Sequence, residues 1–417
     1  MLQNELNRRD FVKKAGLGAA AAIGTSAFSP LAASAVESVG PLMITKVESV
    51  TFKNAHWTWV RIHTDRGIVG TGETYPLSGA QVGALDDLAN LIIGRDARDI
   101  ERIWQDMYFR AAFNVSGGAE MRIISAVNIA LYDIVGQASG LPVYQLIGGK
   151  ARDSVRVYQT SRGEIKNGWT NEKDIEKIVQ FLYDSGIKCI KIWPYDPIGR
   201  RNDGSYISND DLEEGLAWIK RIRNTLGDSM EIAIEFHSYW NLPCAIKIAK
   251  SLEPYNIMWI EDMLMQDNME SYSVLARESN IPVLVSERLA TRFQYRELME
   301  EKGCDIAMWD VTWCGGITEA KKISDFADTY FIPTVPHTHG GPILWLASIH
   351  VSMALTNLWN MESTYNHYTF QFRDFIESYP VPIDGFVKAA DEPGLGLHIV
   401  NGLLESDNAI VKVAAEV

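Results

Sequence analysis

The chain has few cysteines: four in 417 residues, Cys189, Cys244, Cys304 and Cys314, none of them in a CxxC or CxxH pattern. A zinc site is therefore not indicated. The four lie in apolar or turn segments, so we expect thiols buried in the core. Sequence does not decide whether an exported chain pairs them.

Positive charge is also scarce, with 39 Lys and Arg against 53 Asp and Glu and a net charge of −14 at pH 7. This balance argues against nucleic acid or an anionic membrane as a partner. It does not exclude an anionic substrate, because a bound metal can reverse the sign of the charge locally. The length and the 47% hydrophobic content suffice for a large core, either two domains or one barrel with an addition.

The first 35 residues resemble an export signal and are set aside from fold reasoning. Paired Arg8 and Arg9 are followed by Phe11 and Lys13, as in twin-arginine signals, and a weakly apolar stretch comes next. Small residues ending at Ala35 offer a cleavage site. The pattern predicts a signal peptide over 1–35, export through the twin-arginine machinery to the periplasm, and no membrane anchor. The alternative is a disordered tail.

The rest of the chain shows two kinds of periodicity. Residues 36–153 begin with alternating segments typical of antiparallel strands and continue with helical patterns, which predicts an α+β capping domain. Residues 154–379 alternate short apolar runs with amphipathic helical stretches, which predicts a (β/α)8 barrel. Residues 380–417 are expected to return to the first domain. We expect barrel strands to end near Gln159, Ile192, Glu235, Glu261, Ser286, Asp310, Pro336 and Glu362.

Three glutamates, Glu235, Glu261 and Glu287, each close a short apolar run, and each is 26 residues from the next. One strand and helix of such a barrel take roughly 25 to 30 residues, so the three acids should lie side by side at the barrel mouth. Three solvated strand-end acids are the simpler alternative. Clustered carboxylates repel one another, and a hard divalent cation relieves the repulsion. The spacing therefore favours a Mg²⁺ site.

Asp310, His337 and Glu362 continue the series at the next three strand ends. On adjacent strands Asp310 can reach His337, orient its imidazole and raise its pKa, which makes a general base. A histidine before a glycine-rich loop can also be purely structural. The pattern, with a metal triad upstream, favours catalysis.

Two more side chains should point into the barrel mouth. His237 lies two residues beyond Glu235 and so shares its face, where it can be a metal ligand, a general acid or a loop residue. Lys191 ends the second strand, and a lysine inside an apolar strand requires partners, which the acidic rim would supply.

Together these residues resemble the enolase superfamily, in particular its mandelate-racemase-like subgroup, over essentially the whole chain after residue 35. The segments 64–73, 125–134 and 141–149 are similar to the family's capping domain, linking helix and barrel entry. Glu-Phe-His at 235–237 and the segment 286–292 resemble acid-sugar dehydratases of the galactonate and gluconate type. One departure is Trp193, which stands where racemases of the subgroup carry a second lysine base, so a two-base racemisation is disfavoured.

The resemblance implies that one Mg²⁺ is bound by Glu235, Glu261 and Glu287, that Asp310 and His337 form the base dyad, and that Glu362 hydrogen-bonds the enediolate. It implies that His237 protonates the departing 3-hydroxyl of a sugar acid, leaving Lys191 for electrostatics or substrate binding. Residues 74–81 and 113–118 are expected to close over the polyol tail. A homo-oligomer is also expected.

The predicted function is Mg²⁺-dependent dehydration of an aldonate or aldarate to a 2-keto-3-deoxy acid. A sugar-acid cycloisomerase or epimerase with the same dyad is the nearest alternative. A non-catalytic periplasmic sugar-acid-binding protein is the alternative from another class. Sequence identifies neither the sugar acid nor its stereochemistry.

Overall fold

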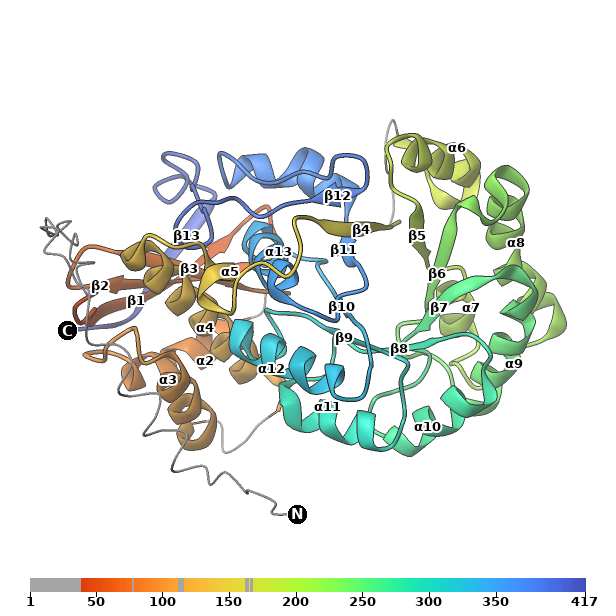
Figure 1. Cartoon of the computed structure of the whole chain (residues 1–417), viewed down its shortest axis with the longest axis horizontal. Helices are drawn as coiled ribbons and strands as arrows, with labels where there is room; N and C mark the ends of the chain where they lie inside the picture. Colours follow the sequence, from red (N-terminus) through yellow and green to blue (C-terminus); the bar gives the residue numbers. More distant parts are fainter. Residues whose placement is uncertain (1–38, 77–78, 112–115, 162–164, 166–167) are drawn as a thin grey trace, which may run out of the picture. The chain divides into compact units, whose positions relative to one another are not determined.

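A computed structural model describes residues 39–76, 79–111, 116–161, 165 and 168–417 (Figure 1). The predicted signal peptide, 1–35, lies outside these residues, as do parts of the two loops expected to cover the substrate, 77–78 and 113–115. The elements given below all belong to the unit Pro41–Val417. Within the described part of the chain, no helix is long and apolar enough to cross a membrane.

An antiparallel sheet forms the core of the first domain, in the order β13-β1-β2-β3. The blue C-terminal strand β13 pairs with the red strand β1 (Figure 1), so the end of the chain completes the domain that begins it. Gly72 on β3 lets helix α4 approach closely, since a Cβ there would lie 1.8 Å from the carbonyl oxygen of Ala126. The strands are β1 (Ile44–Phe52), β2 (Thr58–Thr64), β3 (Val69–Thr74) and β13 (Ala409–Glu416). The helices are α2 (Gly79–Leu88), η1 (Ala89–Leu91), α3 (Ile100–Asp106), η2 (Met107–Ala111), α4 (Gly118–Ser139) and α5 (Val143–Leu146).

Eight parallel strands follow, hydrogen-bonded in the order β10-β9-β8-β7-β6-β5-β4-β11. The ring is joined between its end strands at Thr334, whose N–H donates to Asn357 (2.9 Å) and whose carbonyl accepts from Trp359 (3.0 Å). The strands are β4 (Val155–Thr160), β5 (Cys189–Ile192), β6 (Glu231–Glu235), β7 (Ile257–Glu261), β8 (Val283–Val285), β9 (Ile306–Trp309), β10 (Thr334–Pro336) and β11 (Met361–Ser363). The fold class predicted from the sequence is confirmed.

Helices alternate with these strands: α6 (Asn171–Asp184), α7 (Asp196–Arg201), α8 (Asn209–Leu226), α9 (Leu242–Leu252), α10 (Met269–Glu278), α11 (Thr291–Glu300), α12 (Gly316–Asp328) and α13 (Pro342–Ala354). The short elements are η4 (Gly227–Ser229), η5 (Glu253–Tyr255), η6 (His367–Gln371), η7 (Phe372–Asp374) and β12 (Phe386–Val387), which pairs with β4.

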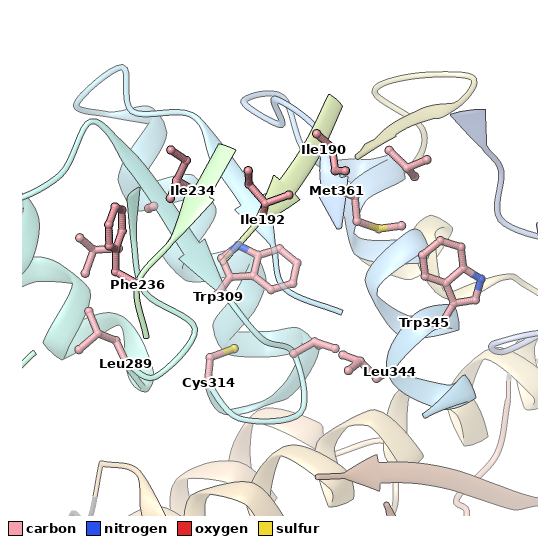
Figure 2. Close-up of a cluster of buried hydrophobic side chains, with 14 of the residues drawn as sticks. Ile190, Ile192, Ile234, Phe236, Leu289, Trp309, Cys314, Leu344, Trp345 and Met361 are labelled. Atoms are coloured by element: carbon pink, nitrogen blue, oxygen red, sulfur yellow. The ribbon is translucent and has the colours of Figure 1, made fainter. Parts of the chain in front are cut away.

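Alternation along the strands determines which side chains face the barrel interior. Ile190 and Ile192 belong to the large apolar layer between strands and helices, with Ile234 and Trp309 (Figure 2). Residues of opposite parity form a second, inner cluster: Tyr158, Cys189, Ala233, Trp259, Leu284, Ile306, Met308 and Val335. The same parity sends Lys191 inward. All four cysteines are buried and free, as expected from the sequence.

Glu73, at the end of β3, joins the first domain to the barrel. Its buried carboxylate accepts hydrogen bonds from Trp59 Nε1 (3.0 Å) and from the backbone N–H groups of Gly341, Ile343 and Leu344 (2.8, 3.2 and 3.2 Å). Gly341 is the N-cap residue of α13, and Ile343 and Leu344 lie in its first turn, where unpaired N–H groups favour an anion. This contact positions the residues after β3 beside the carboxyl ends of the barrel strands.

Candidate active site

A cavity of about 590 Å³ lies at the carboxyl ends of the barrel strands. Six of the eight predicted site residues line it: Lys191, Glu235, His237, Glu287, His337 and Glu362. The other two, Glu261 and Asp310, are fully buried. Tyr75 and Pro76, from the segment 74–81 that was expected to cover the substrate, also line it. The lining residues that sequence reasoning missed are Arg122 from the first domain and Trp193, Arg200, Tyr239, Arg288, Trp313 and His339 from the barrel.

His337 and Asp310 form a close pair, with His337 Nδ1 at 2.7 Å from Asp310 Oδ2. Asp310 is held in turn by the N–H and hydroxyl of Thr312, at 2.7 and 2.6 Å from its other oxygen. His337 Nε2 lies 3.6 Å from Glu362 Oε2. Burial opposes a charged imidazole, but the carboxylates of Glu362 and Asp310 prevail and raise the pKa of His337 to about 9.

His237 has an acidic partner of its own, which the sequence did not reveal. Its Nδ1 lies 2.7 Å from Oδ2 of Asp196, a buried residue at the start of α7. Trp193 packs edge-on against the imidazole, with ring centroids 4.5 Å apart. Burial lowers the pKa of His237, but Glu235 and Asp196 outweigh burial and raise it above the ordinary value. Trp193, at the position where racemases of the subgroup carry a base, therefore contacts His237 and restricts the orientation of its ring.

Lys191 is almost fully buried among carboxylates. Its Nζ lies 3.1 Å from Glu362 Oε1 and 3.3 Å from Glu235 Oε2, and it also forms an ion pair with Glu261. Burial lowers the pKa of Lys191, but Glu261 and Glu362 raise it well above the ordinary value, so the ammonium is retained.

A glutamate that donates a hydrogen bond to an enediolate must be protonated, and the surroundings of Glu362 favour its ionised form instead. Burial raises its pKa, but Lys191 and His337 lower it to about 2, so Glu362 is a carboxylate here. It accepts hydrogen bonds from the Thr160 hydroxyl and from Thr338 N. Lys191 Nζ, 3.1 Å from Glu362 Oε1, is a cationic donor beside this carboxylate.

The three glutamates are not equivalent in the structure. Glu235 and Glu261 are register partners on β6 and β7, whereas Glu261 pairs with Leu284 on β8, three positions before Glu287. Burial and the charge of Glu235 raise the pKa of Glu261 well above the ordinary value, while His237 and Lys191 outweigh burial and lower that of Glu235. Asp262 adds a fourth buried carboxylate, and its pKa is raised by burial and by Glu287.

The donor chemistry of this cluster fits a hard cation. All donors are carboxylate oxygens, and Glu287 Oε2 and Asp262 Oδ1 are buried without hydrogen-bond partners. Across the described residues, however, no group of three or more Asp, Glu, His or Cys side chains is already arranged to hold a metal. Lys191 instead supplies the positive charge between Glu235 and Glu261. The ligand types fit Mg²⁺, whereas the side chains lie as a lysine-bridged cluster.

These features are typical of an enolase-type protein: a parallel barrel, an α+β domain, and a barrel mouth that carries carboxylates, histidines and an inward lysine. Residues 174–402 match the family model of the enolase C-terminal domain-like proteins. Residues 31–148 match that of the mandelate racemase and muconate lactonizing enzyme N-terminal domain. The chain belongs to the mandelate racemase and muconate lactonizing enzyme family of the enolase superfamily, which confirms the predicted resemblance.

Relatives with known names or structures cover most of the chain. A protein of Haloferax volcanii named D-xylonate dehydratase is 30% identical over 348 residues, covering 82% of this chain and 83% of its own. An Agrobacterium tumefaciens enolase of the mandelate racemase subgroup has a crystal structure with 33% identity and a TM-score of 0.83, covering 90% of this chain and 100% of its own. An enolase superfamily member from Salmonella Typhimurium superposes with 27% identity and a TM-score of 0.84, covering 89% and 100%.

Proposed function

We propose that this protein is a Mg²⁺-dependent hydro-lyase that converts a sugar acid, an aldonate or aldarate, into a 2-keto-3-deoxy acid through an enediolate. The observation that carries the proposal is the presence of two His–Asp pairs, His337–Asp310 and His237–Asp196, whose imidazoles line one cavity. They follow β10 and β6, four strands apart in an eight-stranded ring, and therefore face each other across the mouth. The relative named D-xylonate dehydratase supports the same class of reaction.

His337 would remove the proton from C2 of the substrate. Asp310 holds its Nδ1 and leaves Nε2 towards the cavity, and Asp310 stabilises the imidazolium that forms. Lys191 would stabilise the negative charge that develops on the substrate carboxylate, because its ammonium is buried and fixed by three acids.

His237 would deliver a proton to the 3-hydroxyl as the C3–O bond breaks and water leaves. Its raised pKa favours the protonated imidazole, and Asp196 fixes the ring so that Nε2 is the donor. One proton is taken from C2 and one is given to the departing 3-hydroxyl oxygen, so the enol product needs only to tautomerise to the keto acid. This elimination needs only one base, so it does not require the second lysine base that racemases carry at the position of Trp193.

Glu235, Glu261 and Glu287 would hold the cation, with unpartnered Glu287 Oε2 as one of the free donor atoms. When bound, Mg²⁺ would act as a Lewis acid on the substrate carboxylate and, as a nearby positive charge, lower the pKa of His337 towards neutrality.

A panel of aldonates and aldarates, incubated with the purified protein and Mg²⁺, tests the proposal. Formation of a 2-keto-3-deoxy acid is the expected result. Solvent deuterium at C2 without loss of water would instead support the epimerase or cycloisomerase, and binding without any turnover the non-catalytic binding protein.

Export and assembly are also proposed on the sequence alone. Residues 1–35 would direct the folded protein through the twin-arginine machinery, with cleavage near Ala35, and replacing both Arg8 and Arg9 by Lys should leave the precursor uncleaved in the cytoplasm. A homo-oligomer would show in sedimentation as a particle several times the 46.7 kDa chain mass.

A further inference from the structure

We propose that a second cavity beside the active site binds an uncharged glycosyl unit of the substrate, so that the preferred substrates are sugar acids carrying a further sugar ring. This inference rests on the proposed function and specifies its substrate class. The second cavity measures about 540 Å³. Tyr75, Pro76 and His339 line both cavities, so the two are immediate neighbours.

The size of the first cavity already suffices for a whole sugar acid. At about 590 Å³ it lies within the range of about 300–1,000 Å³ that small-ligand pockets span. A single aldonate therefore leaves the neighbouring space unfilled. A substrate that uses both must be larger than one sugar acid.

The two cavities differ in charge. The first is lined by Arg122, Lys191, Arg200, Glu235, Glu287, Arg288 and Glu362. The described lining of the second contains no Asp, Glu, Lys or Arg, and consists of indole, phenol, imidazole, amide and hydroxyl groups. Such a lining fits a neutral ligand with many hydroxyl groups, since it supplies donors and acceptors without a net charge.

Two residues of this lining carry a buried polar atom that is left without a hydrogen-bond partner. Trp57 Nε1 and Thr364 Oγ1 are buried and have no hydrogen-bond partner in the structure, and both residues line the cavity. Trp57 is 5% exposed and Thr364 7% exposed. Polar side chains of the lining can hydrogen-bond to the hydroxyl groups of a sugar ring, while its C–H faces can pack on the aromatic side chains.

A row of rings links the second cavity to the catalytic base. His337 lies 5.5 Å from Trp313 and 6.5 Å from His339 between ring centroids, and Tyr75 stacks on Trp313 at 6.1 Å. His339 continues to His367, at 4.7 Å, in the second cavity. Because C1, C2 and C3 of the acid take part in the reaction, the extra ring would be attached at C4 or beyond.

Binding to the inactive variant His337→Asn in Mg²⁺ tests this without requiring turnover. Gluconate is compared by calorimetry with three acids that carry a hexose on it: maltobionate and cellobionate, linked at O4, and melibionate, linked at O6. We expect at least one glycosylated acid to have a Kd about tenfold or more below that of gluconate. If none of the three binds more tightly than gluconate, the inference is overturned.

Variants then locate the effect. Trp57→Phe keeps an aromatic ring against Phe375 and removes the N–H donor, and Gln371→Ala removes an exposed amide of the second cavity. The preference for the glycosylated acid is measured as the Kd of gluconate divided by the Kd of the glycosylated acid. Each variant should reduce this ratio at least threefold. Gln145→Ala, which changes an exposed residue of α5, is the matched control and should not change the ratio. An unchanged ratio in both cavity variants would overturn the assignment to this cavity. Failure of the proposed function would appear differently, as no keto acid from any acid with the unsubstituted protein.

Discussion

The two histidines should be separable by substitution, because each has its own buried aspartate and faces the cavity from opposite strands of the ring. His237→Asn keeps a hydrogen-bonding group near Asp196 but has no titratable proton. A positioned general acid contributes about 10²–10⁴-fold, so we expect kcat for dehydration to fall by that factor, or about 3–5 kcal/mol of barrier. Exchange of the C2 proton should persist, because His337 and Asp310 are untouched. His337→Asn should abolish exchange and dehydration together.

Proton NMR in D2O follows both events in one sample, as loss of the C2 signal from the remaining substrate and appearance of the C3 proton signal of the monodeuterated keto acid. Circular dichroism and the melting temperature check that both variants are folded. Equal and complete loss of C2 exchange in both variants would refute separate base and acid roles. Retained dehydration in His237→Asn would refute the acid role alone.

Three further outcomes follow from the same geometry. Asp196→Asn should lower dehydration by about 10–100-fold with C2 exchange kept, whereas Asp310→Asn should lower both, as NMR in D2O would show. Treatment with EDTA should abolish turnover and lower the melting temperature, and added Mg²⁺ at 100 times its Kd should restore about 2.7 kcal/mol of stability, measured by calorimetry. In EDTA the pKa of His337 is about 9 in the folded protein, against 6.5 for an unperturbed histidine. Protonation of His337 therefore stabilises the fold by about 3 kcal/mol below pH 6.5, and this stabilisation is lost as the pH rises through 9. Denaturant titrations of the unsubstituted protein and His337→Asn should therefore differ most near pH 6 and converge above pH 9; a constant difference would contradict the shift.

Much of the fold could be predicted because period-2 and period-3.6 patterns are long and regular in this chain. The expected strand ends at Ile192, Glu235, Glu261 and Pro336 coincide with the ends of β5, β6, β7 and β10. Alternation also placed Lys191 inward, because its neighbours Ile190 and Ile192 are the residues that pack on the helices.

The candidate site was less completely predictable, because the conformation of loops does not follow from a periodic sequence pattern. Asp196 follows β5 by four residues, at the start of a six-residue helix, and nothing in its local sequence indicates a contact with His237, which follows the next strand. An acid shortly after a strand end beside a candidate histidine is the only signal that could have identified it. Asp262 directly follows Glu261, and strand alternation predicts that it points outward, but its backbone has φ +46° and breaks the alternation.

The equal spacing of the glutamates also overstated their equivalence. Helix and loop lengths differ between units, so an equal interval in sequence does not give an equal position on each strand. Glu235 pairs with Glu261 in the ladder between β6 and β7, whereas Glu287, 26 residues after Glu261, lies two positions past the end of β8. The charge state of Glu362 depends on Lys191 and His337, which come from other strands, and on full burial. Such a state follows from three-dimensional neighbours rather than from residue type.

A crystal structure of His337→Asn grown with Mg²⁺ and a sugar acid that the unsubstituted protein dehydrates tests the central claim most directly. The predicted result is one cation held by Glu235, Glu261 and Glu287 with the substrate carboxylate, C2 facing residue 337 and the 3-hydroxyl within hydrogen-bond distance of His237. Glutamates that remain bridged by Lys191 around no metal, or a 3-hydroxyl directed away from His237, would contradict it.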